Sequence, residues 1–200
     1  MHVTDLKFSR TEIIHLFRAW LIISLAFAIV FNSDGVFSNK FIYYFTMSSI
    51  IVGTSFLLHE LAHKYFAQKY GCFAEFRSDT LMLIVALVTS FMGFLFAAPG
   101  AVYIIGTLTK RRNGIISLSG PATNLILAAI FFGLTFVNDN LISEIAKYGL
   151  YVNTILAILN LLPFSVFDGK KVWEWSKTAY FTALGLGLVF LMLTFMNLGI

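Results

Sequence analysis

Residues 41–58, FIYYFTMSSIIVGTSFLL, run directly into His59-Glu60-Leu61-Ala62-His63. The first stretch carries no charged side chain and, at about 18 residues, is long enough to be a candidate transmembrane helix. The second places two histidines and a glutamate at the end of that helix. Ionisable groups are costly within a membrane and mark functional sites there. The order His-Glu-x-x-His is also the one that a zinc site on a helix requires.

The composition is that of an integral membrane protein. Of the 200 residues, 58% are hydrophobic and 12% are charged, and the mean hydropathy is +0.84. A soluble domain carries roughly 25% charged residues. The net charge of +4 does not indicate a nucleic-acid partner, because the basic residues are scattered at the ends of apolar runs, where membrane topology uses them. We therefore expect a lipid bilayer around the chain and no nucleic acid.

The apolar segments predict an all-α polytopic membrane protein with about six membrane-embedded segments. Five segments are clear, at residues 13–31, 41–66, 114–137, 146–167 and 178–199. A sixth stretch, near 81–106, is interrupted by glycines and by Pro99. Because no internal repeat or linker divides the chain, we expect residues 1–200 to form one membrane domain with its core at 41–172.

Basic residues predict how these segments are oriented, because positive charges favour the cytoplasmic side. We expect the N-terminus and the active-site end of the bundle to be cytoplasmic. The stretch near 81–106 must then begin and end on one side, as a re-entrant segment, a hairpin or a membrane-dipping strand pair would. A helix that is broken at Pro99 and crosses twice is the alternative. The charges expected on the cytoplasmic side are Lys7, Arg10, Arg18, Lys64, Lys69, Arg77 and Lys110-Arg111-Arg112.

The spacing of the two histidines suits a metal site. His59 and His63 are four residues apart and are therefore neighbours on one helix face, so both imidazoles can bind one ion. Glu60 lies about 100° around the helix from His59, beside the open position of such a site. There it can take a proton from a zinc-activated water and pass it to a leaving amine.

A catalytic zinc needs a third protein ligand, and Asp168 is the candidate. It follows Pro163, which cannot continue a helix, and precedes Gly169, which frees the chain to turn. The charge-based topology, which used lysines and arginines alone, places it at the same end of the bundle as His59 and His63. The competing interpretation is a helix-end residue that pairs with Lys170 or Lys171.

Three sequence blocks together resemble the site-2 protease family of intramembrane zinc metalloproteases. They are HELAH (59–63), SGPATN (119–124) and NLLPFSVFDG (160–169), and the resemblance spans residues 50 to 172. It implies that His59, His63 and Asp168 bind one Zn²⁺ per chain and that Glu60 is the catalytic base. It also implies that the stretch near 81–106 helps to present substrate, with residues 98–102 similar to the family's proline-containing strand loop.

The chain also departs from the family pattern. We find no PDZ-like insertion and no nucleotide-sensing tail, so it is expected to be a bare catalytic core. Lys170 follows Asp168-Gly169 where many relatives have a second glycine, and this affects the expected backbone shape rather than the ligand.

We therefore expect an intramembrane zinc endopeptidase that cleaves a peptide bond within or near a transmembrane segment of another membrane protein. Asn124 and Asn160 are candidates for contact with substrate or transition state, or else for interhelical hydrogen bonds. The alternative function is a zinc-binding membrane protein without proteolytic activity, such as a pseudo-protease or chaperone. A transporter is disfavoured because no repeat is visible, and a prenyl-protein type of membrane zinc protease takes glutamate as its third ligand.

Overall fold

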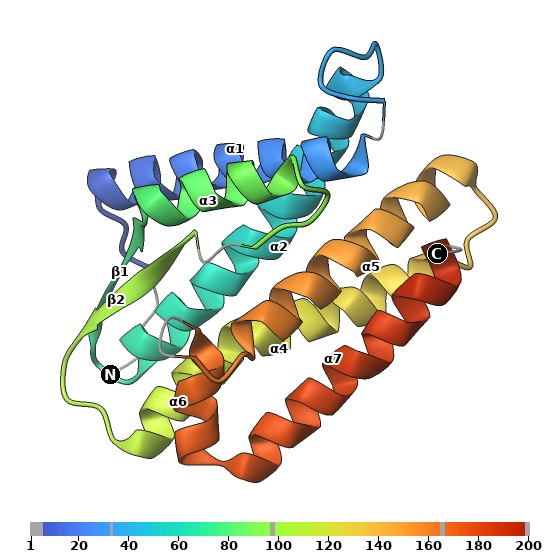
Figure 1. The fold of residues 1–200 in the computed structure, drawn as a ribbon. Helices are drawn as coiled ribbons and strands as arrows, with labels where there is room; N and C mark the ends of the chain where they lie inside the picture. The colour runs from blue at the N-terminus through green and yellow to red at the C-terminus, as the bar shows by residue number, and fades with distance from the viewer. Residues whose placement is uncertain (1–5, 33, 97–98, 165–166, 199–200) are drawn as a thin grey trace.

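The fold is described by a computed structural model over residues 6–32, 34–96, 99–164 and 167–198 (Figure 1). Five of its helices are long and apolar enough to cross a membrane, namely α1, α2, α4, α5 and α7, which confirms an all-α polytopic protein. The elements in chain order are α1 (Arg10–Phe31), α2 (Phe41–Lys69), β1 (Phe73–Ser78), α3 (Thr80–Ser90), β2 (Gly100–Ile105), α4 (Lys110–Leu134), α5 (Asn140–Asn160), α6 (Asp168–Trp175) and α7 (Lys177–Leu198).

The five long helices correspond to the five predicted apolar segments, with shifted ends. α1, α4 and α5 begin where Ser9, Thr109 and Asp139 cap the helix, each side chain accepting a hydrogen bond from a first-turn N–H. α5 ends at Asn160 and not near the predicted residue 167. The reason is Pro163, which has no N–H to continue the helical ladder.

The stretch near 81–106 contains a short helix and a strand. α3 has 11 residues, about 16 Å of helix, which is too short to cross a hydrocarbon core of about 30 Å. The chain then returns as β2, which pairs antiparallel with β1 so that Phe73 lies opposite Ile105 and Ser78 opposite Gly100. The chain therefore leaves the end of β1 and returns to pair with it, in the strand-like form that was expected and not as two helical crossings.

The strands β1 and β2 approach one another closely at Gly100. A Cβ atom there would lie 2.3 Å from the carbonyl oxygen of Arg77, so only glycine fits this register. The partner strand β1 was not among the predicted elements. Three residues of the predicted blocks, Ala98, Ser165 and Val166, lie outside the described residues.

The helices pack in two groups that share α2 and α5. α1 crosses α2 and carries α3 along its side, and the β1–β2 sheet lies against α1 and α2 (Figure 1). α4 packs on both α2 and α5, and α7 packs against α5 and α4. The short helix α6 lies on α4, which brings the chain after Pro163 back to the end of α2 that carries the His-Glu-x-x-His motif.

A buried ion pair joins α1, α2 and β1. The Lys64 ammonium lies 2.6 and 2.8 Å from the two carboxylate oxygens of Glu12, and both residues are 1% exposed. Lys64 also donates to the carbonyl of Ala74, while the N–H of Phe76 donates to Glu12. Lys64 is therefore not one of the surface charges that the sequence predicts.

Replacing Glu12 by glutamine is expected to destabilise the protein, because the Lys64 charge would stay buried without its partner. Loss of one partner of a buried pair typically costs about 3–5 kcal/mol. Thermal unfolding in detergent should show a clearly lower midpoint for Glu12→Gln and little change for Glu174→Gln, which alters an exposed acid. The double variant Glu12→Leu/Lys64→Met should recover most of the loss. An unfolding midpoint for Glu12→Gln equal to that of the unsubstituted protein would contradict the structural role of the pair.

Candidate metal centre

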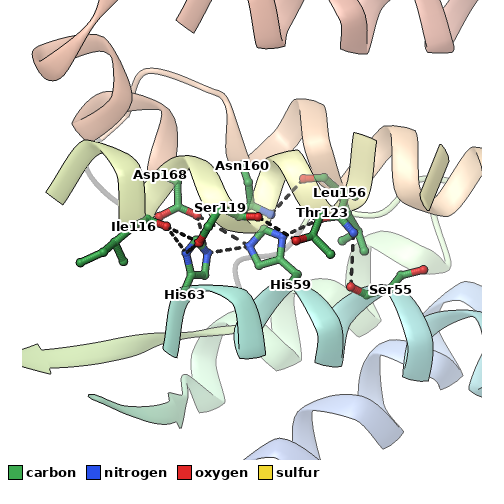
Figure 2. Close-up of polar contacts among 10 residues, drawn as sticks. Ser55, His59, His63, Ile116, Ser119, Thr123, Leu156, Asn160 and Asp168 are labelled. Carbon is green, nitrogen blue, oxygen red and sulfur yellow. Dashed lines mark hydrogen bonds and ion pairs between the residues drawn. The ribbon is translucent and has the colours of Figure 1, made fainter. Parts of the chain in front are cut away.

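Three side chains from two elements converge at the end of α2. His59 and His63 point from α2 toward Asp168, the first residue of α6 (Figure 2). The two Nε2 atoms are 2.9 Å apart, and Oδ2 of Asp168 lies 3.0 Å from Nε2 of His63 and 3.7 Å from that of His59. One ligand atom from each residue lies within 4.8 Å of the others, as in a group that shares one metal ion.

The opposite edge of each imidazole is held by α4. Nδ1 of His63 donates to the carbonyl of Ile116 at 2.7 Å, and Nδ1 of His59 donates to the side-chain oxygen of Asn124 at 2.5 Å. A proton on Nδ1 leaves the Nε2 lone pair free for a metal, and such partners fix the orientation of ligand histidines. The Asn124 amide nitrogen donates to the carbonyl of Ser55 and to Asn153, which sets the orientation of its own side chain.

α4 approaches the two imidazoles so closely that only a glycine fits between them. A Cβ atom at Gly120 would lie 2.3 Å from Nε2 of His63 and 2.5 Å from Nε2 of His59. Those are the two atoms that face Asp168. The space in front of the metal-binding nitrogens therefore exists because residue 120 has no side chain.

Asp168 reaches the site through a sharp return of the chain after α5. A Cβ atom at the next residue, Gly169, would lie 2.2 Å from the carbonyl oxygen of Leu161, so glycine permits this return. The sequence predicts Asp168 at a helix end, and it is in fact the first residue of α6, where the helix dipole favours a negative charge. Burial raises the pKa of the Asp168 carboxyl, but the nearby His63 and His59 outweigh it and hold the pKa below its ordinary value.

A cavity of about 50 Å³ opens beside these ligands, with room for water. Glu60 and Asn160 line it together with the three ligands. Glu60 is 7% exposed, and in the described part of the chain its Oε2 has no hydrogen-bond partner. Asn160 donates to the carbonyl of Leu156 within its own helix. Asn124 is not in the cavity wall and contacts His59 instead.

Some residues of the site were missed at the level of sequence. They are Gly120, the carbonyl of Ile116, Asn153 and Lys171, which also lines the cavity. Gly120 belongs to the SGPATN block that the family resemblance uses, so a signal for it was present. A backbone carbonyl carries no such signal, because every residue has one.

Comparison with known proteins gives three informative relatives. One from Methanocaldococcus jannaschii, named "Putative zinc metalloprotease MJ0611", is 40% identical and the match covers 95% of this chain and 97% of that protein. "Putative zinc metalloprotease YwhC" of Bacillus subtilis is 30% identical, covering 68% and 73%, and "Putative zinc metalloprotease Rip2" of Mycolicibacterium smegmatis is 32% identical, covering 60% and 53%. The chain belongs to the site-2 protease family. No family model matches this chain, and no solved structure matches it.

The residues of this family member fit a catalytic type of metal site. Two imidazole nitrogens and one carboxylate oxygen, with an open position toward a cavity, form a ligand set that suits Zn²⁺. Glu60 lines the cavity at that open position, and the bare Cα of Gly120 lies against both Nε2 atoms.

Substituting alanine for Gly120 is expected to lower the zinc content of the purified protein by about tenfold or more, the scale seen when the surroundings of metal ligands are altered. The added methyl would occupy the space in front of both Nε2 atoms. Elemental analysis of protein purified in detergent measures this directly. Gly133→Ala is the matched control, because it lies on the same helix and its Cβ would meet nothing within 4 Å. Equal zinc in the two variants would show that Gly120 does not shape the site.

Proposed function

We propose that this chain is an intramembrane zinc endopeptidase that cleaves a peptide bond within or near a transmembrane segment of a membrane-protein substrate. The observation that carries the proposal is the convergence of His59, His63 and Asp168 beside the unpartnered carboxylate of Glu60. The names of the relatives support a zinc protease. The position of the site on α2, one of the candidate membrane spans, supports cleavage at the membrane.

In this proposal each residue of the centre has a defined role. His59, His63 and Asp168 hold one Zn²⁺, which when bound acts as a Lewis acid and lets water ionise near neutral pH. Glu60 accepts the proton of the attacking water and delivers it to the leaving amine. The absence of any hydrogen-bond partner at Oε2 among the described residues supports this role, because that oxygen is free to accept.

The two asparagines have different roles in the proposal. Asn160 lines the metal cavity and contacts the substrate or the transition state. Asn124 acts through His59, because its amide group is engaged by His59, Ser55 and Asn153. This arrangement favours an orienting role for Asn124 over direct contact with substrate.

The proposal includes a requirement on the substrate and an orientation in the membrane. A helical substrate segment engages its own carbonyls in hydrogen bonds, so it must unwind locally before water can attack, and segments with glycine, proline or asparagine should be favoured. Residues 1–200 act as one membrane domain with its core at 41–172. The N-terminus and the metal centre face the cytoplasm.

Glu60→Gln separates a protease from a metal-binding protein without proteolytic activity. The variant keeps the shape of the side chain and the three ligands, so zinc should stay near one per chain. Cleavage of a transmembrane peptide should fall by at least ~10²-fold, because an amide cannot accept the proton. Zinc and cleavage are measured on one preparation, with Glu174→Gln as a control at an exposed acid. Full activity of Glu60→Gln would refute the mechanism. An unsubstituted protein that binds zinc but cleaves no helix-destabilised peptide would favour the non-proteolytic alternative.

Labelling of single cysteines tests the orientation. In a Cys72→Ser background, cysteines at positions 69, 111 and 170 should react with an impermeant reagent from one side of the membrane. Cysteines at 34 and 139 should react from the other side, because these exposed positions precede α2 and α5. Inverted membrane vesicles and intact cells give the two sides. Labelling of 69 and 111 from opposite sides would show that the stretch between them crosses the membrane.

A further inference from the structure

The cavity at the metal centre shares part of its wall with a wider one of about 520 Å³. Five residues line both cavities, namely Gly100, Ala101, Val102 and Ile104 of β2 and Lys171 of α6. A peptide held at the metal centre would therefore extend past β2 into the wider cavity. Lys171 stands at the junction of the two.

The charges around this path are not balanced. The charged residues in the wall of the wider cavity are Arg77, Asp79 and Lys171. Arg77 pairs with Glu75 at 2.9 Å, and Asp79 accepts a hydrogen bond from the first turn of α3. Lys171 makes no ion pair or hydrogen bond within the described ranges.

The charge of Lys171 is not neutralised by the metal centre either. Its side chain lines the same cavity as Glu60, His63 and Asp168, so it lies close to the site. Zn²⁺ together with the carboxylates of Asp168 and Glu60 sums to zero. The positive charge of Lys171, which is exposed at the cavity wall, is therefore left for an anionic group that enters with the ligand and can accept a charge-assisted hydrogen bond from it.

We propose that Lys171 selects peptide substrates that carry an aspartate or glutamate within a few residues of the scissile bond. The proposal rests on the peptidase function proposed above. An anionic lipid headgroup offers a similar charge, but the cavity wall that Lys171 shares with the metal centre favours an occupant that is also bound there. Lys171 is thus a specificity-determining residue and takes no part in proton transfer.

The test uses transmembrane peptides that differ at a single position. Aspartate, asparagine or lysine is placed in turn at each position within about four residues of the scissile bond. Cleavage by the unsubstituted protein gives kcat/KM, and binding of fluorescent copies to zinc-loaded Glu60→Gln protein gives affinity without cleavage. At one position at least, aspartate should be preferred over asparagine by about tenfold in both measurements, the factor that one charge-assisted hydrogen bond supplies.

Charge reversal at Lys171 should reverse this preference. Lys171→Glu should favour the lysine peptide over the aspartate peptide, and Lys171→Gln should show no preference. Lys170→Glu is the matched control, because it changes the neighbouring exposed lysine, which lines neither cavity, and should keep the preference for aspartate. Zinc content and unfolding temperature are measured for each variant.

Several outcomes would overturn the proposal. One is an unchanged preference for aspartate in Lys171→Glu, and another is equal binding of the aspartate and asparagine peptides at every position. Loss of binding to phosphatidylglycerol vesicles in Lys171→Glu with unchanged peptide preference would assign the residue to lipid. Loss of zinc in both Lys171 variants would assign it to the metal centre. A preference in binding without cleavage by the unsubstituted protein would support the selectivity of Lys171 and refute the peptidase function.

Discussion

The contact between α2 and α4 positions every other part of the metal centre. Ile116, Gly120 and Asn124 follow one another at intervals of four, so they form one stripe along α4, and His59 and His63 form a similar stripe on α2. Asn124 holds His59, Ile116 holds His63, and Gly120 lies against both imidazoles. The order of these contacts means that the two helices run antiparallel here. A shift of either helix by one turn would move both imidazoles away from the α4 groups that lie 2.5 to 2.7 Å from their Nδ1 atoms.

The remaining ionisable groups of α2 show how a membrane helix carries charge. Lys64 follows His63 directly and points to another side of the helix, where Glu12 of α1 neutralises it. The histidines have Asp168 and α4, so each has a polar partner as well. Glu60 is the exception, because its Oε2 has no partner among the described residues. Buried polar atoms are nearly always hydrogen-bonded, so an unpartnered carboxylate oxygen beside a metal-ligand group is a mark of function rather than of packing.

The long helices could be predicted from the sequence, because apolar runs and their basic ends are properties of short stretches. The proximity of Asp168 to His59 and His63 could be predicted as well, from the motif spacing and the charged ends of the helices. The partnership of Glu12 with Lys64 could not be predicted in this way, since the two residues are 52 positions apart and each alone is typical of a helix end. β1 was missed because Glu75 and Arg77 give its short sequence the composition of a polar loop. The end of α5 was placed too late, although Pro163 is the residue that forces it, because the apolar run continues past the proline.

The charges of α1 hold the small sheet in place. A two-stranded sheet is marginally stable by itself, and here side-chain hydrogen bonds from α1 and α2 support it. Lys64 and Glu12 hold the backbone of Ala74 and Phe76, and His15 and Arg18 of α1 hydrogen-bond to Ser78. The sequence predicted Arg18 as a surface charge, yet it secures the end of β1. These hydrogen bonds are all made to β1, which positions β2 through the strand ladder, and β2 also packs against α2. Because β2 forms one wall of the metal cavity, the shape of that cavity depends on charged residues of α1 that never touch the metal ligands.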